Sequence, residues 1–128
     1  MEELKALLAK DPSLLEKRSR IDTTPLLEAA RIGNPTMVKY LLDMGANYKA
    51  VGLQNSLTAL HCAAIEGDVS VAKLLVIKGC DVNAISLMGE TPLDVATKNG
   101  NIDFAKFLRE HGGLTSVELS RGKGARVP

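Results

Sequence analysis

The side chains of this sequence that are best suited to chemistry are its two histidines and two cysteines, which are His61, Cys62, Cys80 and His111. His61 and Cys62 are adjacent, as in a thiol–imidazole pair, but neighbours on a helix diverge by about 100° and do not face each other. A structural role for both is therefore favoured over catalysis. The spacing of the four residues matches no structural zinc pattern. The sequence also contains no phosphate-binding loop and no nucleophile elbow, so we expect no catalytic residue, no cofactor and no metal site.

Length and composition limit the class of protein. A chain of 128 residues with 45% hydrophobic and 24% charged residues fits one globular domain. The net charge of +1 creates no global field that would attract nucleic acid or an anionic membrane. No apolar run approaches a membrane span, and the start M-E-E-L-K lacks the features of a signal peptide. Two cysteines make no disulfide framework, which favours a reducing compartment: the cytoplasm, with the nucleus as an alternative.

The elements that must position these side chains recur along the chain. Thr24-Pro25-Leu26 returns as Thr58-Ala59-Leu60 and as Thr91-Pro92-Leu93, at steps of 34 and 33 residues. Two series of glycines keep the same steps; they are Gly33, Gly67 and Gly100, and Gly45, Gly79 and Gly112. The sequence therefore contains three copies of one unit.

A repeat period near 33 residues, together with a T-P-L-H-x-A type of motif, resembles the ankyrin repeat. The resemblance implies an all-α solenoid of stacked helix-turn-helix units joined by projecting hairpin loops. It covers residues 1–114, with a half repeat at 1–20 and full repeats at about 21–52, 53–85 and 86–114. We interpret residues 115–128 as a flexible C-terminal tail, since they show no apolar period.

Local signals place the helix ends. Thr24 followed by Pro25 is typical of a helix N-cap followed by proline at the first helical position. Asn34, Asp68 and Asn101 are expected to cap the second helices of their units in the same way. The predicted helices span residues 2–10, 25–32, 35–44, 59–66, 69–78, 92–99 and 102–111. Asp22 and Ser56 stand where the ankyrin pattern usually has glycine, so their two hairpins are expected to depart from the usual form.

Four lysines share one phase of the repeat: Lys5, Lys39, Lys73 and Lys106. Stacking would align them as a ridge on the outer helices. A solvated face is the favoured interpretation, with a docking stripe for an acidic partner as the alternative. The basic residues from Ser120 to Arg126 are likewise interpreted as a solvated terminus rather than a recognition signal.

The resemblance implies that a partner protein binds on the concave face, which hairpin tips and the exposed ends of inner helices form. In this sequence the tip residues are Arg20, Ile21, Thr23, Leu53, Gln54, Asn55, Leu57, Leu87, Met88 and Glu90. The inner-helix residues are Arg31, Ile32, Ile65, Glu66, Lys98 and Asn99. Seven of these sixteen are large apolar residues, and exposed apolar patches often mark interfaces. The alternative is that some tips are covered by neighbouring tips.

The expected function is therefore that of a non-enzymatic protein–protein interaction module, active as a monomer, that binds an unknown partner protein. The alternative is an accessory ankyrin segment of a larger multidomain enzyme, channel or effector protein. Ankyrin domains are also substrates of asparaginyl hydroxylation, and Leu75 with Asp81-Val82-Asn83-Ala84 resembles that pattern. Asn83 is thus a candidate modification site, although bonding of its side chain to loop backbone is the favoured interpretation.

Overall fold

The computed structural model describes residues 24–52 and 55–124, and within these ranges the regular structure is entirely α-helical. The helices are α2 (Pro25–Ile32), α3 (Pro35–Asp43), α4 (Ala59–Glu66), α5 (Val69–Lys78), α6 (Pro92–Lys98), α7 (Ile102–Glu110) and α8 (Ser116–Gly124). The predicted helix 2–10 and the half repeat 1–20 lie outside the described residues. The all-α class predicted from the repeats is confirmed.

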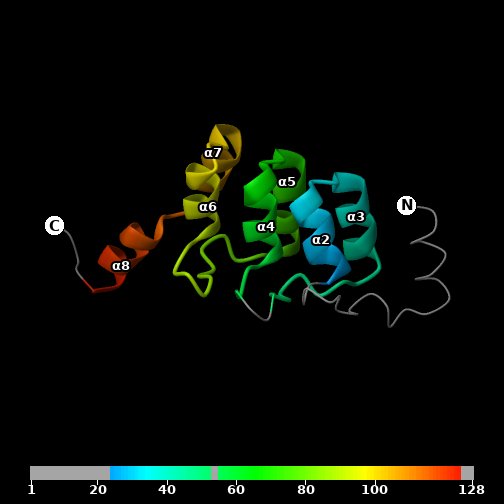
Figure 1. Cartoon of the computed structure of the whole chain (residues 1–128), viewed down its shortest axis with the longest axis horizontal. Helices are drawn as coiled ribbons and strands as arrows, with labels where there is room; N and C mark the ends of the chain where they lie inside the picture. The colour runs from blue at the N-terminus through cyan, green and yellow to red at the C-terminus, as the bar shows by residue number, and fades with distance from the viewer. Residues whose placement is uncertain (1–23, 53–54, 125–128) are drawn as a thin grey trace.

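Three helix pairs, α2/α3, α4/α5 and α6/α7, follow one another along the long axis of the molecule, with their connecting loops along one edge (Figure 1). The inner helix of each pair packs on the next inner helix, α2 on α4 and α4 on α6, and the outer helices α3, α5 and α7 form the second row. Small aliphatic side chains fill the interior. Its fully buried larger members include Leu26, Leu41, Leu60, Leu75, Phe104 and Leu108.

Local capping explains where most helices begin. The Thr58 hydroxyl accepts from the backbone N–H of His61 at 3.2 Å, and the Thr91 hydroxyl accepts from that of Asp94 at 3.1 Å. Thr24, Asn34 and Asp68 cap α2, α3 and α5 in the same manner. Each cap satisfies a backbone donor that the first turn would otherwise leave unpaired. The three predicted caps among them, Thr24, Asn34 and Asp68, are confirmed.

Asn101 occupies the N-cap position of α7, but its side chain makes no capping hydrogen bond, so the predicted side-chain cap was wrong. Its side-chain amide instead donates to the carbonyls of Ala64 at 2.7 Å and Ile65 at 3.0 Å, at the end of α4. A Cβ added to Gly67 would lie only 2.5 Å from the Asn101 side chain, and Gly67 has a positive φ of +85°. Asn101 therefore joins the second unit to the third at the point where α4 ends.

Three helices end one residue earlier than predicted, at Asp43, Lys98 and Glu110. The residues that follow are C-caps. At the end of α7 the last turn tightens as in a 3₁₀ helix, because His111 N–H donates to the Leu108 carbonyl, three residues back, at 3.0 Å. Ser56 adopts φ +58°, the left-handed conformation that Gly89 has in the next hairpin. The hairpin is closed by a hydrogen bond in which Gly52 N–H donates to the Leu57 carbonyl at 3.0 Å. Because serine stands where the ankyrin pattern has glycine, the positive φ is a source of backbone strain at Ser56.

Residues 116–124 form helix α8, so the predicted flexible tail was wrong over this range. The helix begins with a reciprocal cap in which Glu118 N–H donates to the Thr115 hydroxyl at 3.2 Å and Thr115 N–H donates to Glu118 Oε1 at 2.9 Å. Arg109 of α7 donates to the same oxygen at 2.7 Å, and this bond is the first cause that lowers the pKa of Glu118 to about 2. Ser116 N–H also donates to Asp94 Oδ2 at 3.0 Å, which attaches the start of α8 to α6.

Candidate functional site

The predicted concave face consists of hairpin tips and inner-helix ends, and most of its described residues are exposed. Leu57 and Glu90 are half-buried, and Leu57 packs against the core. Five predicted positions lie outside the described residues: Arg20, Ile21, Thr23, Leu53 and Gln54. The exposed positions are Arg31, Ile32, Asn55, Ile65, Glu66, Leu87, Met88, Lys98 and Asn99.

The third hairpin carries the most exposed apolar residues of this face, Leu87 at 70% and Met88 at 79%. A tight turn holds them, since Ser86 N–H donates to the Glu90 carbonyl at 2.9 Å. Leu87 N–H donates to the carbonyl of Asn55 at 2.9 Å, which ties this tip to the preceding hairpin. Ile85, which the sequence reasoning missed, is half exposed beside them, and its only signal is an apolar residue directly after V-N-A. The tips are thus apolar and held by backbone hydrogen bonds.

The inner helices end in a second group of exposed residues. Ile32 closes α2 at 63% exposure, and Ile65 lies in the last turn of α4, which packs on α2. On α6 the corresponding position is Lys98, whose Nζ lies 3.0 Å from Glu90 Oε2 and so joins the helix to its hairpin. This surface offers aliphatic contacts beside the paired charges of Lys98 and Glu90.

His61 is fully buried and both its ring nitrogens are engaged. Nδ1 accepts from the backbone N–H of Thr58 at 3.1 Å, and Nε2–H donates to the Glu90 carbonyl at 2.8 Å, the tautomer that this network requires. Burial lowers the pKa of His61, while the bond to Glu90 opposes the shift. The imidazole therefore fixes the hairpin to α4 and has no free nitrogen for catalysis.

The cysteines are desolvated thiols. Burial raises the pKa of both Cys62 and Cys80 to about 11, so the thiolate that would act as nucleophile or metal ligand is scarce at neutral pH. Among the residues that the structure describes, no three His, Cys, Asp or Glu side chains gather as a metal site would require. Within the same ranges, no helix is long and apolar enough to cross a membrane.

Asn83, the candidate modification site, is bonded at both ends of its amide. Nδ2–H donates to the Gly112 carbonyl at 3.1 Å, and Oδ1 accepts from the N–H of Leu114 at 2.7 Å. The Leu114 carbonyl accepts in turn from the Thr91 hydroxyl at 2.7 Å. The side chain therefore bonds loop backbone, as the favoured interpretation had it, and hydroxylation at Asn83 stays a prediction.

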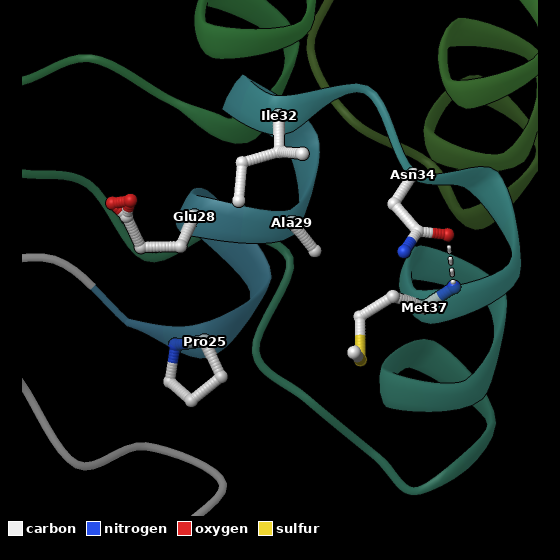
Figure 2. Close-up of a pocket in the computed structure, with 6 residues that line it drawn as sticks. All are labelled: Pro25, Glu28, Ala29, Ile32, Asn34 and Met37. Atoms are coloured by element: carbon white, nitrogen blue, oxygen red, sulfur yellow. Dashed lines mark hydrogen bonds between the residues drawn. The ribbon is translucent and has the colours of Figure 1, made fainter. Parts of the chain in front are cut away.

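A pocket of about 220 Å³ opens on α2 and the start of α3 (Figure 2). It is lined by Pro25, Glu28, Ala29, Ile32, Asn34 and Met37. Four of the six positions one unit later, Ala59, Cys62, Ala63 and Val71, are buried, whereas Glu66 is exposed and Asp68 is half-buried. Because those positions are where the first described unit packs on the second, the pocket belongs to a stacking surface of the repeat and is a poor candidate for a ligand site.

The lysine ridge divides into paired and unpaired members. Lys39 Nζ lies 2.8 Å from Asp43 Oδ2. Lys73 and Lys106 are exposed and form no ion pair within the described ranges, and Lys5 lies outside them. The described part of the ridge therefore presents two lysines, Lys73 and Lys106, that no ion pair engages.

Comparison with known proteins identifies the repeat. The family model of ankyrin repeats in three copies matches residues 2–86 and 49–118. An ankyrin repeat and KH domain-containing protein of Caenorhabditis briggsae is 34% identical over 78% of this chain, and ankyrin repeat and SAM domain-containing protein 6 of Danio rerio is 33% identical over 82%. A glycerophosphocholine phosphodiesterase of Schizosaccharomyces pombe is 34% identical over 76%. The chain spans 4%, 14% and 8% of the length of these three relatives.

Proposed function

This chain belongs to the ankyrin-repeat family, and we propose that it is a non-enzymatic module that binds a partner protein on the concave face of its repeats. Ankyrin repeats generally mediate protein–protein interaction, which supports the class of function. The observation that carries the choice of surface is the exposure of Leu87, Met88 and Ile32 on elements that are themselves held by hydrogen bonds and packing.

The physical basis of binding is rigid display. The hairpin tips are joined by Leu87 N–H to the Asn55 carbonyl, and Glu90 is paired with Lys98. A surface fixed in this way loses little conformational entropy when a partner docks, so more of the free energy of apolar contact appears as affinity. Exposed aliphatic side chains on such a surface provide apolar contacts that are removed from water when a partner docks.

The absence of catalysis is part of the proposal. His61 and Cys62, the pair best suited to chemistry, have their polar atoms engaged or desolvated in the fold. The family is typically non-catalytic. Two free thiols fit a reducing environment, and we therefore propose a cytoplasmic module that acts as a monomer.

The test compares capture of protein partners from lysate by the parent and by surface variants. Ile65→Glu combined with Leu87→Glu should abolish capture, because charges there oppose desolvation of the apolar contacts. Ile102→Glu is the matched control: Ile102 is 78% exposed on α7 and belongs to none of the predicted binding positions. Cys62→Ala and His61→Gln should also retain whatever capture the parent shows at temperatures where they remain folded.

Melting temperatures accompany each variant, since exposed substitutions usually change stability by less than about 0.5 kcal/mol. Capture that survives in the Ile65/Leu87 variant but disappears in a folded His61 or Cys62 variant would contradict the assignment of the concave face.

A second candidate is that the module serves a larger multidomain protein. The S. pombe relative is named as a phosphodiesterase, and this chain spans 8% of it. An antibody raised against this chain would separate the two ideas in a denaturing gel of native extract. A band far above 13.7 kDa supports the larger protein, and a band at that mass supports the independent module.

A further inference from the structure

A groove of about 350 Å³ lies between the outer helices α5 and α7, and none of its residues belongs to the predicted concave face. Val76 and Ile77 of α5 and Phe107 of α7 supply its apolar surface. Ile77 is 81% exposed, the most exposed large hydrophobic residue of the described ranges, whereas Phe107, on the other helix, is buried. The volume is within the range of pockets that hold a side chain or a small ligand.

Ile77 departs from the repeat at this position. The equivalent residues are Asp43 in the first unit and Glu110 in the third, at the same steps of 34 and 33, and both are exposed. Stacking therefore accepts a carboxylate here and does not require an isoleucine. An exposed aliphatic side chain beside an apolar groove is a feature expected of an interaction site.

The second unit also lacks the carboxylate that pairs with the equivalent lysine in the first unit. In the first unit Lys39 pairs with Asp43 four residues later, at 2.8 Å. Lys73 occupies the same position in the second unit, but the residue four positions later is Ile77, and Lys73 forms no ion pair within the described ranges. Lys73 lines the groove together with the apolar residues Val76, Ile77 and Phe107.

The opposite wall has a different charge. His111 Nδ1–H donates to the Phe107 carbonyl at 2.9 Å, and the two rings pack with centroids 4.2 Å apart, which fixes this wall. Glu110 lines the groove beside them. A carboxylate on an occupant is attracted to Lys73 on α5 and repelled by Glu110 on α7, so the charges define its orientation.

We propose that this groove is a second docking site, which binds a short peptide segment of a partner protein that combines a bulky apolar side chain with an acidic residue. The apolar side chain packs against Ile77 and Phe107. The acidic residue pairs with Lys73, in place of the carboxylate that Asp43 supplies to Lys39 in the first unit. Charge complementarity at Lys73 thus selects the occupant, and its contacts are separate from those of the concave face.

The experiment selects phage-displayed random short peptides on the intact chain, with counter-selection on the Ile77→Glu variant. This variant should fold, because the third unit carries Glu110 at the same position, and its glutamate can also pair with Lys73. Enriched peptides should share a bulky apolar residue near Asp or Glu. Enrichment of apolar peptides with Lys or Arg instead, or no enrichment, would overturn the proposal.

The enriched peptides are then synthesised with a fluorophore and titrated against the parent and variants. Lys73→Gln should weaken binding by about tenfold, the worth of one charge-assisted contact. Ile77→Ser, which adds no charge, should weaken it at least as much, whereas Leu87→Glu on the concave face should leave it unchanged. Binding that survives Ile77→Ser, or that is lost in Leu87→Glu, would refute the groove while leaving the concave-face proposal to its own test.

Discussion

Leu75→Ala tests whether packing between units holds this fold together. Leu75 is fully buried on α5, which packs on both α3 and α7, and Leu41 and Leu108 occupy the same position in the neighbouring units. Truncation removes the contacts of the leucine and leaves a cavity, at a cost of about 2–5 kcal/mol. Domains of this size are stable by only about 5–15 kcal/mol, so the loss is a large fraction of the total. A loss of about 3 kcal/mol lowers the melting temperature of a chain of this length by roughly 9–12 °C.

The assay is urea and thermal unfolding followed by the helical circular dichroism signal. Ile77→Ala is the matched control, two residues further along the same helix but 81% exposed, and it should change stability by less than about 0.5 kcal/mol. A Leu75→Ala protein that melts within a few degrees of the parent, or an Ile77→Ala protein that loses as much stability, would refute the argument from inter-unit packing.

Two further predictions follow from particular contacts. The pKa of His61 is lowered in the fold, so the unfolded chain takes up a proton on this residue at a higher pH than the folded chain does. The free energy of unfolding should therefore be highest above about pH 6.5 and should fall as the pH drops below that value. Unfolding titrations at several pH values should show a shallower decline in His61→Gln. Gly67→Ala should cost at least about 1 kcal/mol more than Gly45→Ala in urea unfolding, since both glycines have positive φ but only at Gly67 would the new Cβ meet the Asn101 side chain, at 2.5 Å. Equal losses in the two glycine variants would show that the Asn101 contact yields easily.

The fold could be predicted because its signals are local and repeated. Thr24 and Thr91 cap the helix directly after them, and each is followed by proline, so a few letters determine where α2 and α6 begin. The same reasoning failed at Asn101, because its hydrogen bonds go to Ala64 and Ile65 in the preceding unit. A local pattern cannot show that a side chain prefers a partner more than thirty residues away.

Helix α8 is a different kind of failure. The signal was present, since Thr115-Ser116-Val117-Glu118 has the spacing of a capping box. The absence of an apolar period concealed it, because the start of this helix is attached by polar contacts, with Arg109 on Glu118 and Ser116 N–H on Asp94. The predicted binding positions were taken from the geometry of the ankyrin family. That geometry did not indicate that Leu57 is half-buried, because its burial depends on the core residues that it packs against.

The residues that recur in this chain and those that do not carry different information. Thr91 with Asp94 repeats the reciprocal cap of Thr58 with His61, so the recurrence of such positions is explained by stacking and capping alone. Positions where the units differ are free of that constraint. Leu87 stands where the second unit has Gln54, and Ile77 stands where its neighbours have Asp43 and Glu110. Each of these changes places an aliphatic side chain in solvent at 70% or 81% exposure, which gives the fold nothing. Contact with another protein is one use that such side chains can have, so the breaks in the repeat coincide with the two surfaces proposed for binding.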